Sequence, residues 1–396
     1  MFWLLIDILD IILFIPCAFA VVYLLVFAII SCFYQRVEPG ITRRDGRFLI
    51  ITTVTAKDQY IEDTIKSILK QQYEQKNYEL VVVGDKLTPL QKIKLAQYPI
   101  TLLCTDLKNG TKGKAQRYAI ENLHSMKIFD NVILLDPDET VMPDFLTETN
   151  KVLQAGQRFF QLHRKPQNTK TDTAIISATM EEINNSIFRK GHVVLGMPSS
   201  LIGSAVSLDF SWFKNNVSKI DTNDEEKSLE ALLLSQNIFV DYIDDVCVYY
   251  RSLSSNSEIV NQRKRWMQSR ISSLYRNIKK VLPSFIHWNR NIIDKLITWT
   301  LIPRIILMGI ILLMGIILPL IYFTLAIKWW ILFLIVTFAF AFATPDYLAQ
   351  DKGWAKSFKH MPLIILGSLF NLISNNALTQ SIKGIFKKKK TKKAQS

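Results

Sequence analysis

The sequence has few cysteines, and their spacing excludes several kinds of protein. Only four occur among 396 residues, at Cys17, Cys32, Cys104 and Cys247. They show none of the short spacings of a metal site, and two lie inside a long uncharged run, so a disulfide framework is not expected. The pattern Gly-x-x-x-x-Gly-Lys-Ser/Thr is also missing, which excludes a P-loop. Any nucleotide site must therefore be built in another way.

Charged residues are absent from three long stretches, 11–34, 305–327 and 329–344. A helix that crosses a bilayer needs about 20 apolar residues. The first two stretches reach this length. The third is shorter, but it begins with Trp329 and Trp330, which suit a membrane interface. The sequence therefore predicts three membrane-spanning helices.

A cleaved signal peptide and buried core helices fit these stretches less well than membrane spans. A signal peptide would begin with basic residues and end at a small-residue site, but Asp7 and Asp10 precede the first stretch. Buried core helices would account for the second and third stretches. The second stretch is longer than 20 residues and contains Gly and Pro, which favours membrane spans.

The chain has a formal net charge of +14, and its basic residues cluster beside the uncharged stretches and in a tail at 387–393. Cytoplasmic flanks of membrane helices carry the excess of Lys and Arg. Residues 36–300 and the tail are therefore predicted to be cytoplasmic, at the cell (inner) membrane. Nucleic-acid binding is the alternative for so basic a chain. Basic residues beside membrane-spanning helices more often contact anionic lipid. The lipid bilayer is therefore the predicted partner, and no nucleic acid is expected.

The middle of the chain alternates between two hydrophobic periodicities. Strand-like runs occupy 47–55, 78–85, 100–106 and 131–139, and helical patterns occupy 60–72, 89–97 and 113–126. This alternation predicts an α/β fold, a parallel sheet with helices on both faces. Ligands of such sheets bind beyond the carboxyl ends of the strands.

Acidic side chains follow several of these predicted strands. Asp85, Asp106 and Asp136 each stand at a strand end, and the run "LLDPDE" adds Asp138. In an extended segment Asp136 and Asp138 project to the same side. Two such carboxylates repel each other unless a cation lies between them, and Mg²⁺ or Mn²⁺ bridging to phosphates is the usual solution. An ordinary acidic turn is the alternative.

A glycine-containing turn opens the third predicted helix. The run "NGTKGKAQ" (109–116) places Lys112 and Lys114 at a helix start, an arrangement that suits a diphosphate. A solvated helix start is the alternative. Another predicted strand ends in His163-Arg164, which can reach the same edge of the sheet, although a structural histidine is the more frequent case.

The order of these features resembles the membrane-bound, processive family 2 glycosyltransferases, which include cellulose, chitin and hyaluronan synthases. The α/β half, the Asp-x-Asp and a "QxxRW" element at 262–266 stand in that order before the membrane helices. Residues 181–205 also resemble a subgroup common in Bacteroidetes-type sequences. The resemblance implies a GT-A domain with a mixed, mostly parallel sheet, flanked by transmembrane and interfacial helices.

The resemblance and the hydropathy together imply five regions. They are 1–35, an N-terminal transmembrane helix; 45–255, the cytoplasmic GT-A domain; 256–300, amphipathic interfacial helices; 305–345, two transmembrane helices; and 354–396, an interfacial helix with a polybasic tail.

The resemblance also implies a donor site for a UDP-sugar. Asp85 would bind the uracil, Lys112 or Lys114 would neutralise phosphate, and Asp136 and Asp138 would hold the diphosphate and the metal, Mg²⁺ or Mn²⁺. Fixed cations around the diphosphate stabilise the charge that develops on the departing UDP.

The resemblance further implies a polysaccharide acceptor, which would bind opposite the UDP-sugar. Gly203 and Ser204 would line its loop, and Gln262, Arg265 and Trp266 would lie on an amphipathic helix at the membrane surface. Arg265 would face the leaving diphosphate, and Trp266 would stack on the acceptor sugar. Export of the product would need a homo-oligomer or a partner, because three spans are few for a channel.

The general base departs from the family pattern, which has a Glu-Asp pair. Aligning the following helix places Glu225 and Glu226 there, with Glu226 as the base. A shift by one residue would favour Glu225, and Asp224 also lies close. A base must reach the acceptor hydroxyl.

Two further departures support the alternative of a degenerate, non-catalytic relative that acts as a binding or assembly subunit. Lys57 stands where the family has Glu, although Asp58 can substitute. Ala205 replaces the second Gly of a Gly-Ser-Gly loop, and its Cβ can crowd the sugar.

Overall fold

A computed structural model describes residues 2–38, 40, 44–107, 110–123, 128–167, 171–220, 225–251 and 289–350. Its contacts divide the chain into two units. The sheet unit comprises Gln35–Asn168 and Gly196–Ser252, and the helical unit comprises Met1–Tyr34, Thr169–Leu195 and Leu253–Ser396.

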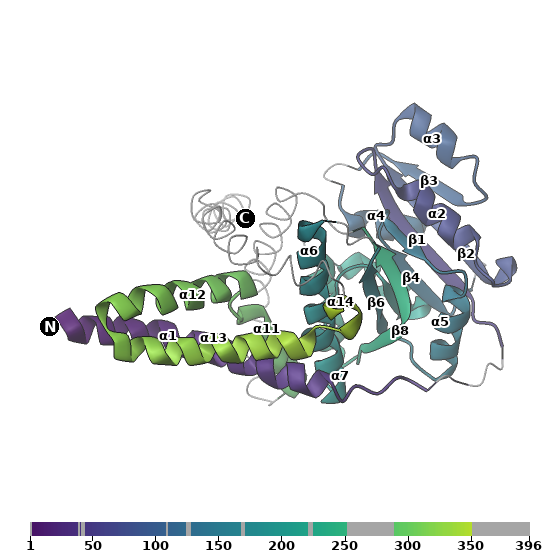
Figure 1. The fold of residues 1–396 in the computed structure, drawn as a ribbon. Helices are drawn as coiled ribbons and strands as arrows, with labels where there is room; N and C mark the ends of the chain where they lie inside the picture. Colours follow the sequence, from purple (N-terminus) through teal and green to yellow (C-terminus); the bar gives the residue numbers. More distant parts are fainter. Residues whose placement is uncertain are drawn as a thin grey trace, which may run out of the picture. The chain divides into compact units, whose positions relative to one another are not determined.

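The sheet unit is built on one sheet, for which the described residues supply eight strands in the order β3-β2-β1-β4-β7-β6-β8-β5 (Figure 1). The strands are β1 (Phe48–Thr55), β2 (Tyr78–Asp85), β3 (Thr101–Thr105), β4 (Asn131–Leu135), β5 (Glu139–Val141), β6 (Phe160–Pro166), β7 (Val206–Asp209) and β8 (Asp241–Tyr250). The first three strands match the predicted runs to within one residue at each end, and β4 occupies the first five residues of the fourth run.

The sheet is mixed, and its parallel half positions the site. Strands β1, β2, β3 and β4 are mutually parallel, so their carboxyl ends lie along one edge. Strand β7 pairs with β4 in the antiparallel direction, β6 and β8 are parallel to each other, and β5 is antiparallel to β8. The α/β prediction is confirmed for this sheet.

Helices cover both faces of the sheet because the side chains of its strands alternate. In β1, Phe48 and Ile50 belong to one buried cluster, and Leu49 and Ile51 belong to another. The first cluster is covered by α2 (Ile61–Leu69), α3 (Pro89–Leu95) and α5 (Phe145–Gln154), and the second by α4 (Lys112–Glu121), α8 (Phe210–Asn216) and α9 (Glu225–Ser235). Two 3₁₀ turns, η1 (Gln75–Asn77) and η3 (Val217–Lys219), complete this unit. Each fully buried aliphatic or aromatic side chain stabilises the sheet by about 1.5–3 kcal/mol.

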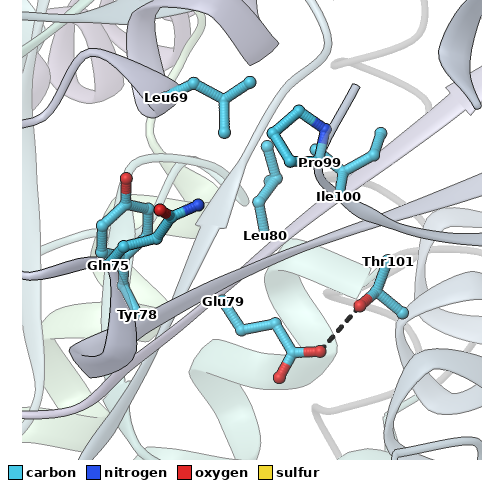
Figure 2. A pocket seen from close by; sticks show the side chains of 8 residues that line it. All are labelled: Leu69, Gln75, Tyr78, Glu79, Leu80, Pro99, Ile100 and Thr101. Atoms are coloured by element: carbon cyan, nitrogen blue, oxygen red, sulfur yellow. Dashed lines mark hydrogen bonds between the residues drawn. The ribbon is translucent and has the colours of Figure 1, made fainter. Parts of the chain in front are cut away.

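A pocket of about 340 Å³ opens where strands β2 and β3 begin (Figure 2). Tyr78, Glu79 and Leu80 line it from β2, and Thr101 from β3 donates a hydrogen bond of 2.7 Å to Glu79. None of the predicted site residues lines this pocket. It lies at the amino ends of the strands, opposite to the edge where parallel sheets bind ligands.

The helical unit contains three helices that are long and apolar enough to cross a membrane: Ile6–Ser31, Arg304–Ile321 and Phe323–Ala343. This agrees with the three predicted spans. The helices of the unit are α1 (Phe2–Ser31), α6 (Asp172–Asn184), the π-helical turn η2 (Asn185–Lys190), α7 (Gly191–Val194), α11 (Arg290–Thr300), α12 (Arg304–Ile321), α13 (Phe323–Ala343) and α14 (Asp346–Ala349). Helices α1, α12 and α13 lie side by side (Figure 1).

The break between the second and third spans differs from the prediction. The sequence placed it at Lys328, but the chain leaves the helix at Tyr322 (φ −152°, ψ 90°). Pro319 has no backbone N–H to bond to the Gly315 carbonyl four residues earlier. That carbonyl instead accepts a hydrogen bond of 3.0 Å from the Trp330 indole.

Lys328 lies inside α13 because an acid neutralises it there. Its ammonium contacts the carboxylate of Asp10 in α1, which is 2% exposed. The indole of Trp329 donates to the same carboxylate at 2.8 Å and is fully buried. The N–H of Trp329 is therefore used inside the helix bundle, and the location of Trp329 and Trp330 at a membrane interface stays a prediction.

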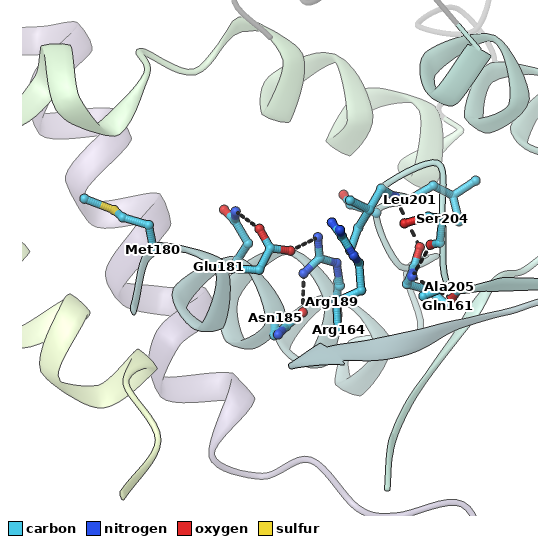
Figure 3. Close-up of polar contacts among 12 residues, drawn as sticks. Gln161, Arg164, Met180, Glu181, Asn185, Arg189, Leu201, Ser204 and Ala205 are labelled. Atoms are coloured by element: carbon cyan, nitrogen blue, oxygen red, sulfur yellow. Dashed lines mark hydrogen bonds and ion pairs between the residues drawn. The ribbon is translucent and has the colours of Figure 1, made fainter. Parts of the chain in front are cut away.

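Polar contacts also tie the other helices of this unit together. Tyr23 in α1 donates to Asp294 in α11 at 2.8 Å and lies 2.9 Å from Nε2 of the buried His192 in α7. Arg189 of η2 pairs with Glu181 of α6 at 3.1 Å, and Figure 3 shows this pair beside Asn185.

Candidate functional site

Asp85 ends strand β2 at the carboxyl edge of the sheet, as predicted. Its Oδ1 accepts a hydrogen bond of 2.9 Å from the Leu107 amide, which fixes the side chain. A Cβ added at Gly110 would lie 2.0 Å from Oδ2. The backbone of the loop after β3 therefore closes on this carboxylate, and only glycine permits so close an approach.

Asp136 follows strand β4 and is held by Lys112 from the first turn of α4. The Lys112 ammonium lies 2.5 Å from Oδ1 of Asp136. Burial opposes ionisation of Asp136, but the charges of Lys112 and Arg164 outweigh it, so the pKa of this carboxyl is lowered. Burial likewise disfavours the ammonium of Lys112, and the charge of Asp136 reverses the balance and raises its pKa. The structure thus brings together two residues predicted from separate motifs.

Asp138 lies in the turn between β4 and β5. Burial, followed by the negative charges of Asp136 and Asp58, raises its pKa. Among the described residues, no three His, Cys, Asp or Glu side chains form a metal cage. A nucleotide-bound Mg²⁺ needs only one or two carboxylates, because phosphates and water complete its shell. Asp138 fits that role, whereas one oxygen of Asp136 is already taken by Lys112.

Glu139 was not predicted to belong to the site, yet it lies at its centre. The side chain is fully buried and accepts hydrogen bonds from the Asp136 amide (2.9 Å), Arg164 Nε (2.6 Å) and Ser204 Oγ (2.8 Å). Burial raises its pKa, while Arg164 opposes the shift. The only sequence signal was its position after Asp-Pro-Asp, where an acid is usually solvated.

The loop before β7 carries the predicted acceptor residues. Lys112 also donates to the Gly203 carbonyl at 2.7 Å, so one ammonium bridges Asp136 and this loop. Gly203 has φ +85°, and a Cβ there would lie 3.4 Å from Cβ of Glu226. Glu226 therefore packs against the loop, and its carboxylate pairs with Lys227 at 2.8 Å.

Gln161 of strand β6 fixes the same loop (Figure 3). Its amide nitrogen donates to the carbonyls of Ser204 (3.0 Å) and Ala205 (2.8 Å), and its oxygen accepts from the Ile202 amide at 3.1 Å. Ala205 is fully buried with φ +51°, in the left-handed region that favours glycine. Its Cβ packs in the core, so alanine here keeps the turn that a glycine would make.

Glu225 lies against the start of α4, where the sequence placed a diphosphate. Its carboxylate accepts hydrogen bonds from the amides of Gly113 and Lys112. The next amide, of Lys114, bonds to Thr111 Oγ1 at 3.4 Å, so Glu225 and Thr111 together cap the helix. Burial raises the pKa of Glu225 to about 7, although Lys112 and these amides oppose the shift.

Several predicted site residues lie outside the described residues. They are Asp224, Gln262, Arg265 and Trp266. Their roles stay predictions. Within the described part, Asp136, Lys112, Gly203, Glu225 and Glu226 are joined to one another by direct contacts, and Asp85 lies on the same edge of the sheet.

A family model described as "Glycosyl transferase family group 2" matches residues 131–344, more than half of the chain. No curated protein matches the chain by sequence. Among solved structures, the mannosyltransferase PcManGT from Pyrobaculum calidifontis, in complex with GDP-Man and Mn²⁺, has a TM-score of 0.55 and 13% identity. The alignment covers 92% of this chain and 98% of that one.

A second similar structure is S. aureus TarS 1-349, with a TM-score of 0.39 and 13% identity over 58% of this chain. This chain spans 64% of the length of that TarS chain. At such identities the likeness to PcManGT concerns the fold alone, a GT-A-like mixed sheet with helices, and the likeness to TarS supports no further argument. The family match covers Asp136, the loop at Gly203 and two of the long apolar helices. On the strength of this match, the chain belongs to the family 2 glycosyltransferases.

Proposed function

We propose that this glycosyltransferase moves a sugar, with inversion, from a UDP-sugar to a growing polysaccharide at the cytoplasmic face of a membrane. One observation carries the proposal: Lys112 bridges Asp136, on the donor side, and the Gly203 carbonyl of the acceptor loop. In this proposal a single fixed cation would lie between the donor and the acceptor, where charge develops on the leaving diphosphate.

The donor's base would bind at Asp85. A carboxylate held by the Leu107 amide presents its remaining lone pairs to an N–H donor, such as N3–H of uracil. Guanine also offers N–H donors, and PcManGT was solved with GDP-Man. UDP-sugars are the proposed donors, and GDP-sugars are the competing outcome of a donor screen.

The diphosphate would be held by Asp138 through a divalent cation, with Lys112, Lys114 and Arg265 as further cations. Mg²⁺ or Mn²⁺ at this position would neutralise the phosphate oxygens and so favour departure of UDP. Asp136, fixed by Lys112, would orient the donor rather than share the metal equally.

Glu226 would act as the general base, because it packs against the acceptor loop at Gly203. It would take the proton of the acceptor hydroxyl as that oxygen attacks the anomeric carbon. The bond between this carbon and the UDP oxygen breaks, and UDP leaves with the electron pair. Glu225, on the helix start, is the alternative base.

The three apolar helices would span the inner membrane with the sheet unit and the tail in the cytoplasm. Trp266, with Gln262, would hold the acceptor sugar at the membrane surface, and the product would be exported through a homo-oligomer or with a partner. The charge distribution of the sequence supports this orientation.

A screen of UDP- and GDP-sugars for nucleotide release, with Mg²⁺ or Mn²⁺ and an oligosaccharide acceptor, tests the proposal. We expect release with a UDP-sugar, loss of it on chelation, and loss of it in Asp138→Asn. The matched control is Asp245→Asn, an acid of β8 that pairs with Arg36 at 3.1 Å. Folded protein that turns over no donor would refute catalysis and favour a non-catalytic binding subunit.

A further inference from the structure

Glu139 is a buried acid whose hydrogen bonds reach three separate segments. It begins strand β5, pairs across to Tyr250 of β8, and has no exposed side-chain surface. Its donors come from the β4–β5 turn (Asp136), from β6 (Arg164) and from the loop before β7 (Ser204). One carboxylate therefore links three parts of the chain that are distant in sequence.

The three donors fix the direction of the carboxylate as well as its position. Oε1 accepts from both Arg164 and Ser204, and Oε2 accepts from the Asp136 backbone. An unpaired carboxylate in such a place would be strongly unfavourable, whereas one that receives charged and neutral donors is held firmly. Displacing Glu139 would therefore remove one hydrogen bond from each of the three segments at once.

Arg164 extends this network to the side chain of Asp136. Its Nη2 lies 4.0 Å from Oδ2 of Asp136, and its guanidinium lies 4.7 Å from the centre of the Tyr250 ring. Lys112 holds the other oxygen of Asp136. The donor-side acid is thus fixed through its amide by Glu139 and through its carboxylate by two cations.

Ser204 extends the network to the acceptor side. Its hydroxyl donates to Glu139 and is close enough to Asp136 to lower the pKa of that carboxyl as well. Gln161 donates a hydrogen bond of 3.0 Å to the Ser204 carbonyl, so hydrogen bonds fix both the backbone and the side chain of Ser204. The donor and acceptor segments therefore share one anchor.

We propose that Glu139 is the positioning residue of the site, which sets the acceptor loop at Ser204 in register with the donor-binding Asp136 through Arg164. This inference rests on the proposed function. Glu139 touches neither substrate in this role, and its effect on rate passes through the residues it holds. A misplacement of about 1 Å is enough to cost about 100-fold in rate.

Glu139→Gln tests the proposal, because the amide keeps the shape but presents an NH₂ group to one or more of the three donors. In purified full-length enzyme we expect kcat per folded molecule to fall by about 10- to 100-fold, with a donor KM changed by less than about fivefold. The matched control is Glu79→Gln at the opposite end of the sheet, where the carboxylate accepts a hydrogen bond from Thr101. It should keep the kcat of the wild type.

A double-mutant cycle that combines Glu139→Gln with Ser204→Ala separates a positioning role from a general effect on stability. If Glu139 acts by holding Ser204, the two substitutions together should lower kcat by much less than the product of their separate effects. Ser204→Ala alone removes one hydroxyl and serves as the milder variant should Glu139→Gln fold poorly. An unchanged kcat in Ser204→Ala, or fully multiplicative effects, overturns the inference.

The wild-type assay keeps this outcome apart from failure of the proposed function. A wild-type enzyme with no transfer to any acceptor refutes the function itself. An active wild type with a Glu139→Gln variant of equal kcat refutes only the positioning role of Glu139.

Discussion

Lys112 is the residue at which the charges of the site converge. Its ammonium contacts Asp136 and the Gly203 carbonyl, and Glu225 lies against the helix turn that carries it. Because its side chain is only 23% exposed, water screens these contacts weakly. A single lysine therefore balances Asp136, which follows strand β4, and a second acid, Glu225, at the helix start.

Lys112→Met should remove this balance. We expect the pKa of Asp136 to rise, stability to fall by about 1–3 kcal/mol, and kcat/KM to fall by about 100-fold, since a fixed cation is lost where charge develops. Thermal unfolding and UDP-release kinetics measure the two effects. Lys94→Met, at an exposed lysine of α3, is the control. Wild-type kinetics in Lys112→Met would remove this cation from the mechanism.

The proposed diphosphate site beside Glu225 predicts that donor binding depends on pH. With a pKa of about 7, its carboxyl is neutral below that pH and charged above it, where it competes with a diphosphate for the amides of Lys112 and Gly113. If the charged form must be displaced, donor KM should rise about tenfold between about pH 6 and about pH 8. Glu225→Gln should flatten this rise.

The same group gives a stability trend of defined sign. Its folded pKa of about 7 lies above the ordinary value of 4.5, so the folded protein binds more protons between these values. This contribution to stability is present below about pH 4.5 and is lost as the pH rises to about 7. A steeper loss in Glu225→Gln than in the wild type over this range would contradict the assignment.

The sequence predicted the positions of some site residues but not of others. Asp85, Asp136 and Lys112 could be predicted because strand ends and helix starts are recognisable local patterns. The position of Glu139 could not, since two of its three donors, Arg164 and Ser204, lie 25 and 65 residues away in the sequence. The contact of Glu225, the first residue of α9, with the start of α4 was missed for the same reason, because more than a hundred residues separate the two helices.

Among the elements, α1 and α13 are joined by charge inside apolar helices. Asp10 and Lys328 contact each other, and Trp329 donates to the same acid. In an apolar surrounding neither charge is stable alone, so each one is tolerated because of the other. The pair thus fixes which face of α1 meets α13.

Removing one partner of the Asp10–Lys328 pair should destabilise the protein more than replacing both partners. Asp10→Leu or Lys328→Met alone should lower stability by about 3 kcal/mol, because one buried charge is left unpaired, whereas the double variant should lose much less. Thermal unfolding in detergent micelles measures this, with Asp7→Asn in the same helix as control. Equal losses in the single and double variants would show that the two charges do not stabilise each other.

The uncharged stretches predicted the number of apolar helices correctly, but not where each helix ends. The uncharged stretches predicted three long helices, and three are present among the described residues. The rule that a charge ends a span misplaced the break at Lys328, because the partner of that lysine lies more than three hundred residues away. A local feature, Pro319, accounts better for the end of α12.

At the scale of the whole molecule, the sequence predicted the parallel half of the sheet and little of the rest. Strands β1 to β4 follow the alternation of strand and helix. The order β7-β6-β8-β5 that completes the sheet depends on pairings between strands far apart in the chain, which no local pattern encodes. Glu139 belongs to this second half, so the missing topology and the missing role of Glu139 have one cause.

The proposed metal-binding role of Asp138 predicts how the protein takes up its ligands. One carboxylate offers too few ligands for tight binding of a free cation, and in the proposal the diphosphate supplies the others. UDP and Mn²⁺ together should therefore raise the melting temperature by more than the sum of their separate effects. At a ligand concentration of about 100 times Kd the stabilisation is about 2.7 kcal/mol. Asp138→Asn should abolish the synergy and retain the small effect of UDP alone, because Asp85 and Lys112 remain. A full shift with Mn²⁺ alone would instead require a preformed metal site, and then Asp138 would not depend on the nucleotide for its role.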